Sequence, residues 1–520
     1  MKWEGRMLSR RALLKGAAAT SGGLILNRSG FASAPPASGA STHVQSYVLP
    51  SLSNGVQIIP ILTTGEYADN GYRMVGIPDG LGALKDGNTF SVYMHHELGA
   101  SAGAIRAHGS KGAFVSKWTI DRNSFRVLEG ADLIPSASKL WQWNTTTQRY
   151  VAGGAKAFDR LCSADLPDEK ALRHGNRGTS ERLFLGGEET NNGSAWARIV
   201  TGPNAGETWQ LPRLGRMAWE NAVACPHGKD KTIVACMDDG LLSNDTVTPV
   251  ASDNPSEVFI YIGSKQREGN EIEQAGLTNG KLYGIRVRRN DGTLVAAESD
   301  LLGLGSGTGN YVSTGRFELV EIGSNGDVSG MTNVQQEQSA INNNVFRFQR
   351  PEDGAWDPRG NGNDSYYFVT TASISPLRNS RLWRLRFDDI DNPEAGGRID
   401  ILLTNVPGRM FDNITIDGLG RLLLQEDTGN NAWVAKIWVY GLDSGSLVEV
   451  AHHDPALFEN VNSPTFITVD EESSGIIDAQ HIFGQGWFLF VVQNHKASSD
   501  PELVEGGQLL AMYVHPQIGR

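Results

Sequence analysis

Residues 346–357 read Phe-Arg-Phe-Gln-Arg-Pro-Glu-Asp-Gly-Ala-Trp-Asp, and the interpretation of the chain starts from this stretch. Pro351 fixes its own φ and biases Arg350 towards an extended conformation. Because residues i and i+2 of an extended segment point to the same face, Arg350 and Glu352 are expected side by side. A guanidinium can hold a phosphate through two parallel hydrogen bonds, and a carboxylate suits a hard metal ion. The alternative is a surface ion pair at a strand end.

The rest of the composition is typical of many short strands joined by tight turns. The chain has 520 residues, of which 61 are glycine and 20% are charged. Short aromatic and β-branched runs alternate with Gly, Asn and Asp clusters such as Asn290-Asp291-Gly292. Strands are expected at residues 57–62, 89–94, 113–120, 181–185, 232–236, 257–262, 281–287, 365–370, 381–387, 420–425, 487–492 and 509–514.

These runs predict an all-β fold. Weak repetition of strand pairs favours a closed, six-bladed β-propeller with loop insertions, forming a single domain over residues 41–520. A large β-sandwich is the alternative, and a parallel α/β fold is disfavoured because crossover helices are missing. Residues 152–176 and 334–345 are expected to be insertions or loops with at most short helices.

Residues 1–40 are expected to be a twin-arginine signal peptide and linker. Arg10 and Arg11 lie in the motif Ser9-Arg10-Arg11-Ala12-Leu13-Leu14-Lys15, and an apolar run too short to span a bilayer permanently follows. This leader predicts recognition by the twin-arginine export machinery, which transports folded proteins. The expected location is the periplasm or the medium, with no permanent membrane span.

The net charge and the cysteine content argue against a nucleic-acid-binding protein and against a disulfide-rich scaffold. The formal net charge is −12 with no sustained basic run, so nucleic acid is not an expected partner. Cys162, Cys225 and Cys236 are too few for a disulfide scaffold, although one pair could form. Cys225 and Cys236 lie in apolar runs and are expected in the core. No feature indicates an oligomer, so a monomer is expected.

Five acidic stretches follow or end apolar strands, at residues 94–97, 185–189, 217–221, 350–353 and 424–427. If these strand ends meet at one end of a propeller, the carboxylates require cations, and calcium prefers oxygen ligands. The candidate metal ligands are Glu97, Glu188, Glu189, Glu220, Glu352 and Asp427. His95, His96 and His495 could add nitrogen ligands, although a structural role is more common for a histidine. The clusters at residues 238–240 and 470–472 are interpreted as turns.

An ordered set of motifs resembles the PhoX family of alkaline phosphatases. The motifs are residues 76–82, 94–99, 109–115, 188–189, 215–220, 350–352 and 492–495, and the resemblance covers most of residues 45–500. It implies a β-propeller whose central site holds iron and calcium and hydrolyses phosphate monoesters. Carried over by position, Arg350 would contact the phosphate of a small ester as a catalytic and substrate-binding residue, and the ligands would be Glu97, Glu189, Glu220 and Glu352.

Two positions depart from that family. It typically has a cysteine before its paired glutamates, which is an iron ligand, whereas this chain has Gly187; Trp219 stands where the family tends to have histidine. Loss of a thiolate removes the soft ligand that favours iron. An all-calcium site or an inactive one is therefore an alternative. The functional alternatives are a calcium-binding propeller that acts as a non-catalytic binding module and a hydrolase of a phosphodiester or lactone.

Overall fold

The computed structural model describes residues 36–240, 255–298, 314–360, 364–371, 380–404 and 406–520. The predicted leader, with Arg10 and Arg11, lies outside these residues, and the domain boundary near residue 40 stays a prediction. Among the helices in the described ranges, none is long and apolar enough to cross a membrane.

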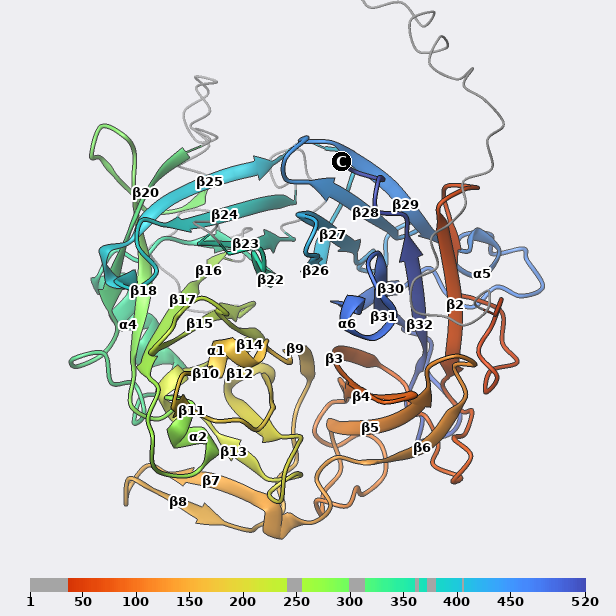
Figure 1. The fold of residues 1–520 in the computed structure, drawn as a ribbon, viewed down its shortest axis with the longest axis horizontal. Coiled ribbons are helices and arrows are strands. Elements are labelled where there is room, and N and C mark those ends of the chain that lie inside the picture. The colour runs from red at the N-terminus through yellow and green to blue at the C-terminus, as the bar shows by residue number, and fades with distance from the viewer. Residues whose placement is uncertain (1–35, 241–254, 299–313, 361–363, 372–379, 405) are drawn as a thin grey trace, which may run out of the picture.

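The strands form mainly antiparallel groups that are placed radially around a common centre, in chain order (Figure 1). The first group contains β3 (Pro78–Asp86), β4 (Thr89–His96), β5 (Phe114–Asp121) and β6 (Val127–Asp132). The second contains β9 (Leu161–Asp165), β12 (Leu183–Ile199), β13 (Thr208–Gln210), β7 (Leu140–Asn144) and β8 (Arg149–Ala152). The third contains β14 (Arg216–Ala224), β15 (Lys231–Asp238), β17 (Val258–Ser264) and β18 (Lys281–Arg288).

The later groups continue around the same centre. The fourth contains β22 (Pro351–Trp356), β23 (Ser365–Thr370), β24 (Arg381–Phe387) and β25 (Gly397–Leu403), and β20 (Thr314–Glu321) joins β25 to β18. The fifth contains β26 (Phe411–Ile416), β27 (Arg421–Glu426), β28 (Lys436–Gly441), β29 (Leu447–His453) and β1 (Val48–Pro50). The sixth contains β30 (Glu471–Asp478), β31 (Trp487–Asn494), β32 (Gly506–Val514) and β2 (Val56–Thr63).

Helices are short and lie in the connections. The α-helices are α1 (Glu169–Leu172), α2 (Glu271–Gln274), α4 (Asn333–Asn342), α5 (Pro455–Phe458) and α6 (Gln480–Phe483). The 3₁₀ turns are η1 (Ala137–Lys139), η2 (Pro212–Leu214) and η4 (Pro393–Ala395). The remaining short strands are β10 (Arg173–His174), β11 (Arg177–Gly178), β16 (Pro255–Ser256), β19 (Leu294–Val295) and β21 (Phe348–Gln349).

The innermost strands define the centre. Strands β3, β9, β14, β22, β26 and β30 each contact the next in this order, and β30 also contacts β3. Strand β2, from the N-terminal side, pairs with β32 near the C-terminus, with Val56 opposite Val514. The all-β prediction is confirmed, and the radial arrangement is that of a β-propeller.

The apolar core lies between neighbouring strand groups. Every residue of β31 is buried, because its sheet packs on both faces. On one face Phe490 packs with Val439 and Val450 of the fifth group. On the other, Leu489 packs with Trp118 of the first. Burying each such side chain contributes roughly 1.5–3 kcal/mol, so the spacing of the groups is fixed by side-chain volume.

The chain enters most of the innermost strands through a left-handed residue. Positive φ occurs at Ile77, Arg160, Gly215, Arg350 and Met410, which directly precede β3, β9, β14, β22 and β26. The expectation of an extended Arg350 is therefore wrong, because its φ is 53°. Such backbone is costly for a residue with a Cβ and persists where surrounding contacts enforce it.

The expectation for residues 152–176 is also wrong in one respect. This stretch contains β9, an innermost strand, and Leu161 and Cys162 on it are buried. The run Leu-Cys-Ser-Ala-Asp lacks a clear apolar signal, because the neighbouring strands β3, β12 and β14 supply the burial. The stretch 334–345 does contain a helix, α4.

The buried His453 predicts a pH dependence of folding. Burial lowers its pKa from 6.5 to about 3, so between these values only the unfolded chain binds the proton. Stability contributed by the neutral ring is then lost as the pH falls below 6.5, by about 1.4 kcal/mol per pH unit. The free-energy difference between wild type and His453→Gln, measured by urea unfolding, should narrow from pH 7 to pH 4.5. A constant difference for His453→Gln would contradict the prediction.

Candidate metal centre

Acidic and thiol side chains gather where the innermost strands begin. The second residue of a strand supplies Asp79 on β3, Cys162 on β9, Glu352 on β22, Asp412 on β26 and Glu472 on β30. All five are buried. The repeated position explains the convergence, because equivalent ends of radially arranged strands meet around one axis.

Bulges direct several of these side chains to the centre. The pairing register shifts between Pro78 and Leu81, Trp219 and Ala222, Pro351 and Gly354, and Phe411 and Ile414. These intervals enclose Asp79, Glu220, Glu352 and Asp412. A bulge places extra residues opposite the partner strand and re-aims side chains. It thereby frees consecutive polar residues from the strict in-and-out alternation of a strand.

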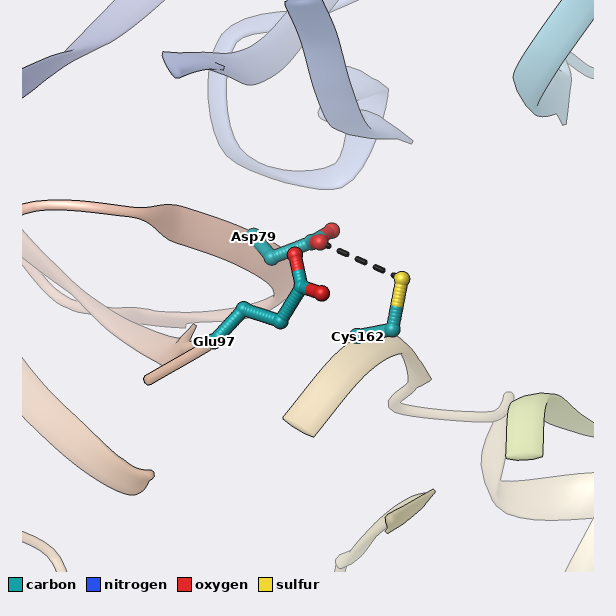
Figure 2. A group of neighbouring side chains, drawn as sticks. All are labelled: Asp79, Glu97 and Cys162. Carbon is teal, nitrogen blue, oxygen red and sulfur yellow. Dashed lines mark hydrogen bonds between the residues drawn. The ribbon is translucent and has the colours of Figure 1, made fainter. Parts of the chain in front are cut away.

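Three overlapping donor groups cross the centre. They are Asp79–Glu97–Cys162, Cys162–Glu189–Glu220 and Glu220–Glu352–Asp412, and within each group the potential ligand atoms lie within 4.8 Å of one another. Figure 2 shows the first, with the thiol facing two carboxylates; Cys162 Sγ lies 3.3 Å from Asp79 Oδ2. Cys162 and Glu220 are shared, so the groups form one continuous centre that we call the carboxylate–thiol centre.

Two guanidinium groups lie beside this centre. Arg160 Nη2 is 2.7 Å from Glu97 Oε1 and 2.5 Å from Glu189 Oε2. Arg350 Nη2 is 2.9 Å from Glu352 Oε1, with Asp239 as its second partner. The predicted proximity of Arg350 and Glu352 is confirmed, although a left-handed backbone produces it. Both arginine side chains retain solvent exposure, 51% for Arg160 and 28% for Arg350.

Electrostatics in the centre favour cations. Burial, followed by neighbouring carboxylates, raises the pKa of Asp79 and Asp412 well above the ordinary range. Burial raises the pKa of Glu220 to about 8. Burial and the surrounding carboxylates also raise the pKa of Cys162. Bound cations would reverse these shifts, because they stabilise the ionised donors. The mixture of carboxylate oxygens and one sulfur therefore fits metal ions.

A layer of hydrogen-bonded side chains forms the floor of the centre. Ser474 donates to Asp79 Oδ1 at 2.6 Å, and Ser163 donates to Glu220 Oε1 at 2.6 Å. Asn413 donates to Ser163 Oγ at 3.3 Å. These contacts orient the donors in the way that outer-shell partners orient metal ligands. Beyond this layer, the later parts of the inner strands line a separate cavity of about 920 Å³.

The predicted ligands fall into two classes. Glu97, Glu189, Glu220 and Glu352 belong to the three donor groups. Glu188 does not: its Oε1 lies 2.6 Å from Lys156 Nζ, and its Oε2 accepts from Trp196. Asp427 also lies outside them, although it forms a β-bridge with Glu472 and burial raises its pKa to about 7. Glu188 and Asp427 thus both lie outside the donor groups, and Asp427 remains beside the centre.

The three histidines make structural contacts. His95 Nδ1 lies 2.7 Å from the carbonyl of Cys162. His96 contacts the Gly76 carbonyl and Ser116. His495 Nδ1 is 2.8 Å from Glu505 and its Nε2 is 3.6 Å from Glu472. None of the three belongs to a donor group among the described residues.

Sequence reasoning missed several members of the site. The missed residues are Asp79, Cys162, Asp412, Asp239, Glu472 and Arg160. The interpretation of residues 238–240 and 470–472 as simple turns is corrected, because Asp239 and Glu472 lie at the site. For Asp79, Cys162, Asp412 and Glu472 the available signal was a polar or thiol residue at the second position of an inner strand. It could not be used before those strands were known.

The inference of a missing thiol is wrong, because Cys162 belongs to two donor groups. Position 187 cannot carry a side chain here: a Cβ on Gly187 would lie 2.3 Å from Trp219. Gly187 and Trp219, the two departures from the resembled family, therefore belong to one packing arrangement. The indole of Trp219 occupies the space that a side chain at position 187 would need. The three cysteines of the chain are buried and form no disulfide.

The fold and site define a β-propeller with a buried carboxylate–thiol centre. The chain is similar to a structure of Pseudomonas fluorescens PhoX in complex with vanadate, a transition state analogue, with a TM-score of 0.58, 13% identity, and coverage of 94% of this chain and 98% of that chain. A protein of unknown function from Dyadobacter fermentans gives a TM-score of 0.41 at 8% identity, covering 89% and 100%. No family model and no curated protein matches. At this identity the likeness to PhoX shows the fold.

The packing of Gly187 against Trp219 can be tested by Gly187→Ala. The added methyl group overlaps the fully buried indole, so the variant should lose about 1–3 kcal/mol of unfolding free energy. Denaturant unfolding would measure the loss. Gly330→Ala is the control, since a Cβ there meets nothing within 4 Å. Equal stability of Gly187→Ala and wild type would refute the explanation for the absent side chain.

Proposed function

We propose that the protein is a metal-dependent phosphatase that hydrolyses phosphate monoesters outside the cytoplasm. The observation that carries this proposal is the carboxylate–thiol centre with two guanidinium groups beside it. Cations and guanidinium groups are the groups that stabilise a transferring phosphoryl. The likeness to PhoX supports the proposal, because the matching structure holds vanadate, a transition state analogue.

The donor set suggests which metals the centre holds. Glu220, Glu352 and Asp412 offer only oxygen and suit calcium, whereas the groups containing Cys162 offer a softer sulfur that suits iron. When bound, these ions would supply the positive charge that attracts and polarises phosphate oxygens. This local charge is needed because the protein as a whole is acidic, with a net charge of −12.

Arg350 would bind the phosphate. It donates from Nε and Nη2 to Asp239, and its Nη1 has no hydrogen bond to any residue in the described ranges. The carboxylate partners hold the guanidinium in one orientation before substrate arrives, and such preorganisation lowers the cost of stabilising developing charge. Arg160, held by Glu97 and Glu189, would contact the anion from the β9 side.

The proposed assignment includes three wider features. We propose a closed ring of six blades, supported by the contact of β3 with β30 and the pairing of β2 with β32. We propose export through the twin-arginine machinery to the periplasm or the medium, supported by the motif at residues 9–15. The remaining expectations are a small phosphate ester as the substrate, a monomer, and no nucleic-acid partner.

The non-catalytic alternative loses its main motive. That alternative rested on the departures at Gly187 and Trp219, and Cys162 supplies a thiol to the donor groups. A phosphodiesterase or lactonase remains an alternative because the same centre can polarise other esters. Substrate choice therefore needs a direct assay.

Activity towards p-nitrophenyl phosphate tests the proposal. Protein purified without chelator should release p-nitrophenol, lose that activity in EDTA, and regain it with calcium and iron, because cations hold the acidic centre in its binding state. A diester and a lactone are assayed in parallel. Turnover of either without monoester hydrolysis would select the rival hydrolase. No turnover, with thermal stabilisation by calcium, would select the binding module.

Arg350→Met tests the proposed phosphate contact. Loss of the guanidinium should lower kcat/KM for p-nitrophenyl phosphate by about 10²–10³-fold, because a preorganised charged donor is removed from the transition state. The matched control is Arg316→Met, which breaks an exposed ion pair with Asp388 on the outer strands. Metal content is measured for both variants. Wild-type kcat/KM in metal-loaded Arg350→Met would reject this role.

Cys162→Ser tests the sulfur ligand. Replacing sulfur with oxygen should strongly reduce bound iron and leave the all-oxygen group with its calcium, because thiolate favours the softer metal. Elemental analysis of protein purified without chelator gives both contents. Cys225→Ser, at a buried cysteine outside the donor groups, is the control. Unchanged iron in Cys162→Ser would show that the thiol is not a ligand.

A further inference from the structure

Arg198 is a buried cation outside the carboxylate–thiol centre. It lies on β12, none of its surface is exposed, and none of its three guanidinium nitrogens has a hydrogen-bond partner within the described parts of the chain. A buried charge left without a partner is strongly destabilising, so native structures pair it with an opposite charge or an ion. The pKa of Arg198 is lowered by burial to about 9, which still leaves it positively charged at neutral pH.

A second buried hydrogen-bond donor without a partner among the described residues lies on the same face of the sheet as Arg198. Thr208 of β13 stands opposite Arg198 in the antiparallel register, and its hydroxyl is also buried without a partner among the described residues. Directly opposed side chains lie on one face of the sheet, with Cβ atoms about 5 Å apart. Five guanidinium N–H groups and one O–H group therefore share a dry location.

The surrounding charges leave a positive excess. Glu188 is the carboxylate that acts on the pKa of Arg198, and it also acts on the pKa of Arg216. Its Oε1 is already engaged by Lys156 at 2.6 Å. Three cations thus share one carboxylate. A negatively charged group near Arg198 would restore the charge balance of this cluster.

We propose that Arg198 and Thr208 bind a small monovalent anion of the halide class between the strand group of β4 and that of β12. A halide accepts several hydrogen bonds and offers no donor that would need its own partner. It also suits a location without solvent exposure, where a larger oxyanion would need more room than a close-packed interior leaves. The proposal does not depend on the proposed catalytic function.

His95 links the proposed anion site to the carboxylate–thiol centre. His95 on β4 is close enough for Arg198 to influence its pKa, and its Nδ1 donates to the carbonyl of Cys162 at 2.7 Å. Gly186 allows this ring to approach, since a Cβ there would lie 2.5 Å from His95 Cε1. An anion that neutralises Arg198 would therefore hold together the interface that positions the thiol.

Halide dependence of thermal stability tests the proposal. At constant ionic strength, replacing gluconate with chloride should raise the Tm of the full chain by a few degrees. Once the chloride concentration exceeds its Kd, the Tm should rise with the logarithm of that concentration. Crystals soaked in bromide should show an anomalous peak beside Arg198. Thr208→Val, which removes only the hydroxyl, should shift the halide titration to several-fold higher concentration.

Arg198→Met supplies the decisive variant because it removes the charge and keeps the length of the side chain. Its Tm should no longer respond to chloride, whereas Arg182→Met, at a partly buried arginine bonded to the Pro167 carbonyl, should respond as wild type does. If Arg198→Met does not fold, the bromide peak and the Thr208→Val titration still decide. A wild-type Tm independent of the halide, with no peak beside Arg198, would mean water only and would overturn the proposal.

Discussion

Repulsion among buried carboxylates is the constraint on which this structure depends. Asp79, Glu189, Glu220, Glu352 and Asp412 occupy one centre, and burial together with mutual repulsion opposes their ionisation. An isolated chain segment could not hold such a set, because the free energy of bringing the charges together exceeds what any local contact returns. The apolar layers between the strand groups provide the compensating free energy.

The fold meets this constraint with local features that recur from one strand group to the next. A left-handed residue turns the chain into an inner strand, a bulge re-aims the following side chains, and a polar layer beneath them donates hydrogen bonds. Each device is weak alone. Because they recur in successive strand groups, the donors reach one centre with their orientation fixed by packing and hydrogen bonds.

Charge balance also explains the arginines. Arg160 and Arg350 stand immediately before inner strands, where they neutralise carboxylates and remain partly exposed. Arg198 is the contrasting case, since it is fully buried and shares its carboxylate with other cations. Arg160 and Arg350 therefore neutralise carboxylates beside the centre. Arg198, in contrast, needs the anion proposed above as its counter-ion.

The sequence by itself determined the all-β class, because short apolar runs separated by Gly, Asn and Asp have few other solutions, and every strand run that it indicated overlaps a strand. It also indicated Glu97, Glu189, Glu220 and Glu352, since each lies in an acidic stretch that follows or ends an apolar run. Only the tertiary structure placed Asp79, Cys162 and Asp412 beside them and separated Glu188 from them. The physical reason is that the register of each inner strand, and hence the direction of its side chains, is set by bulges and by packing against neighbours distant in the sequence.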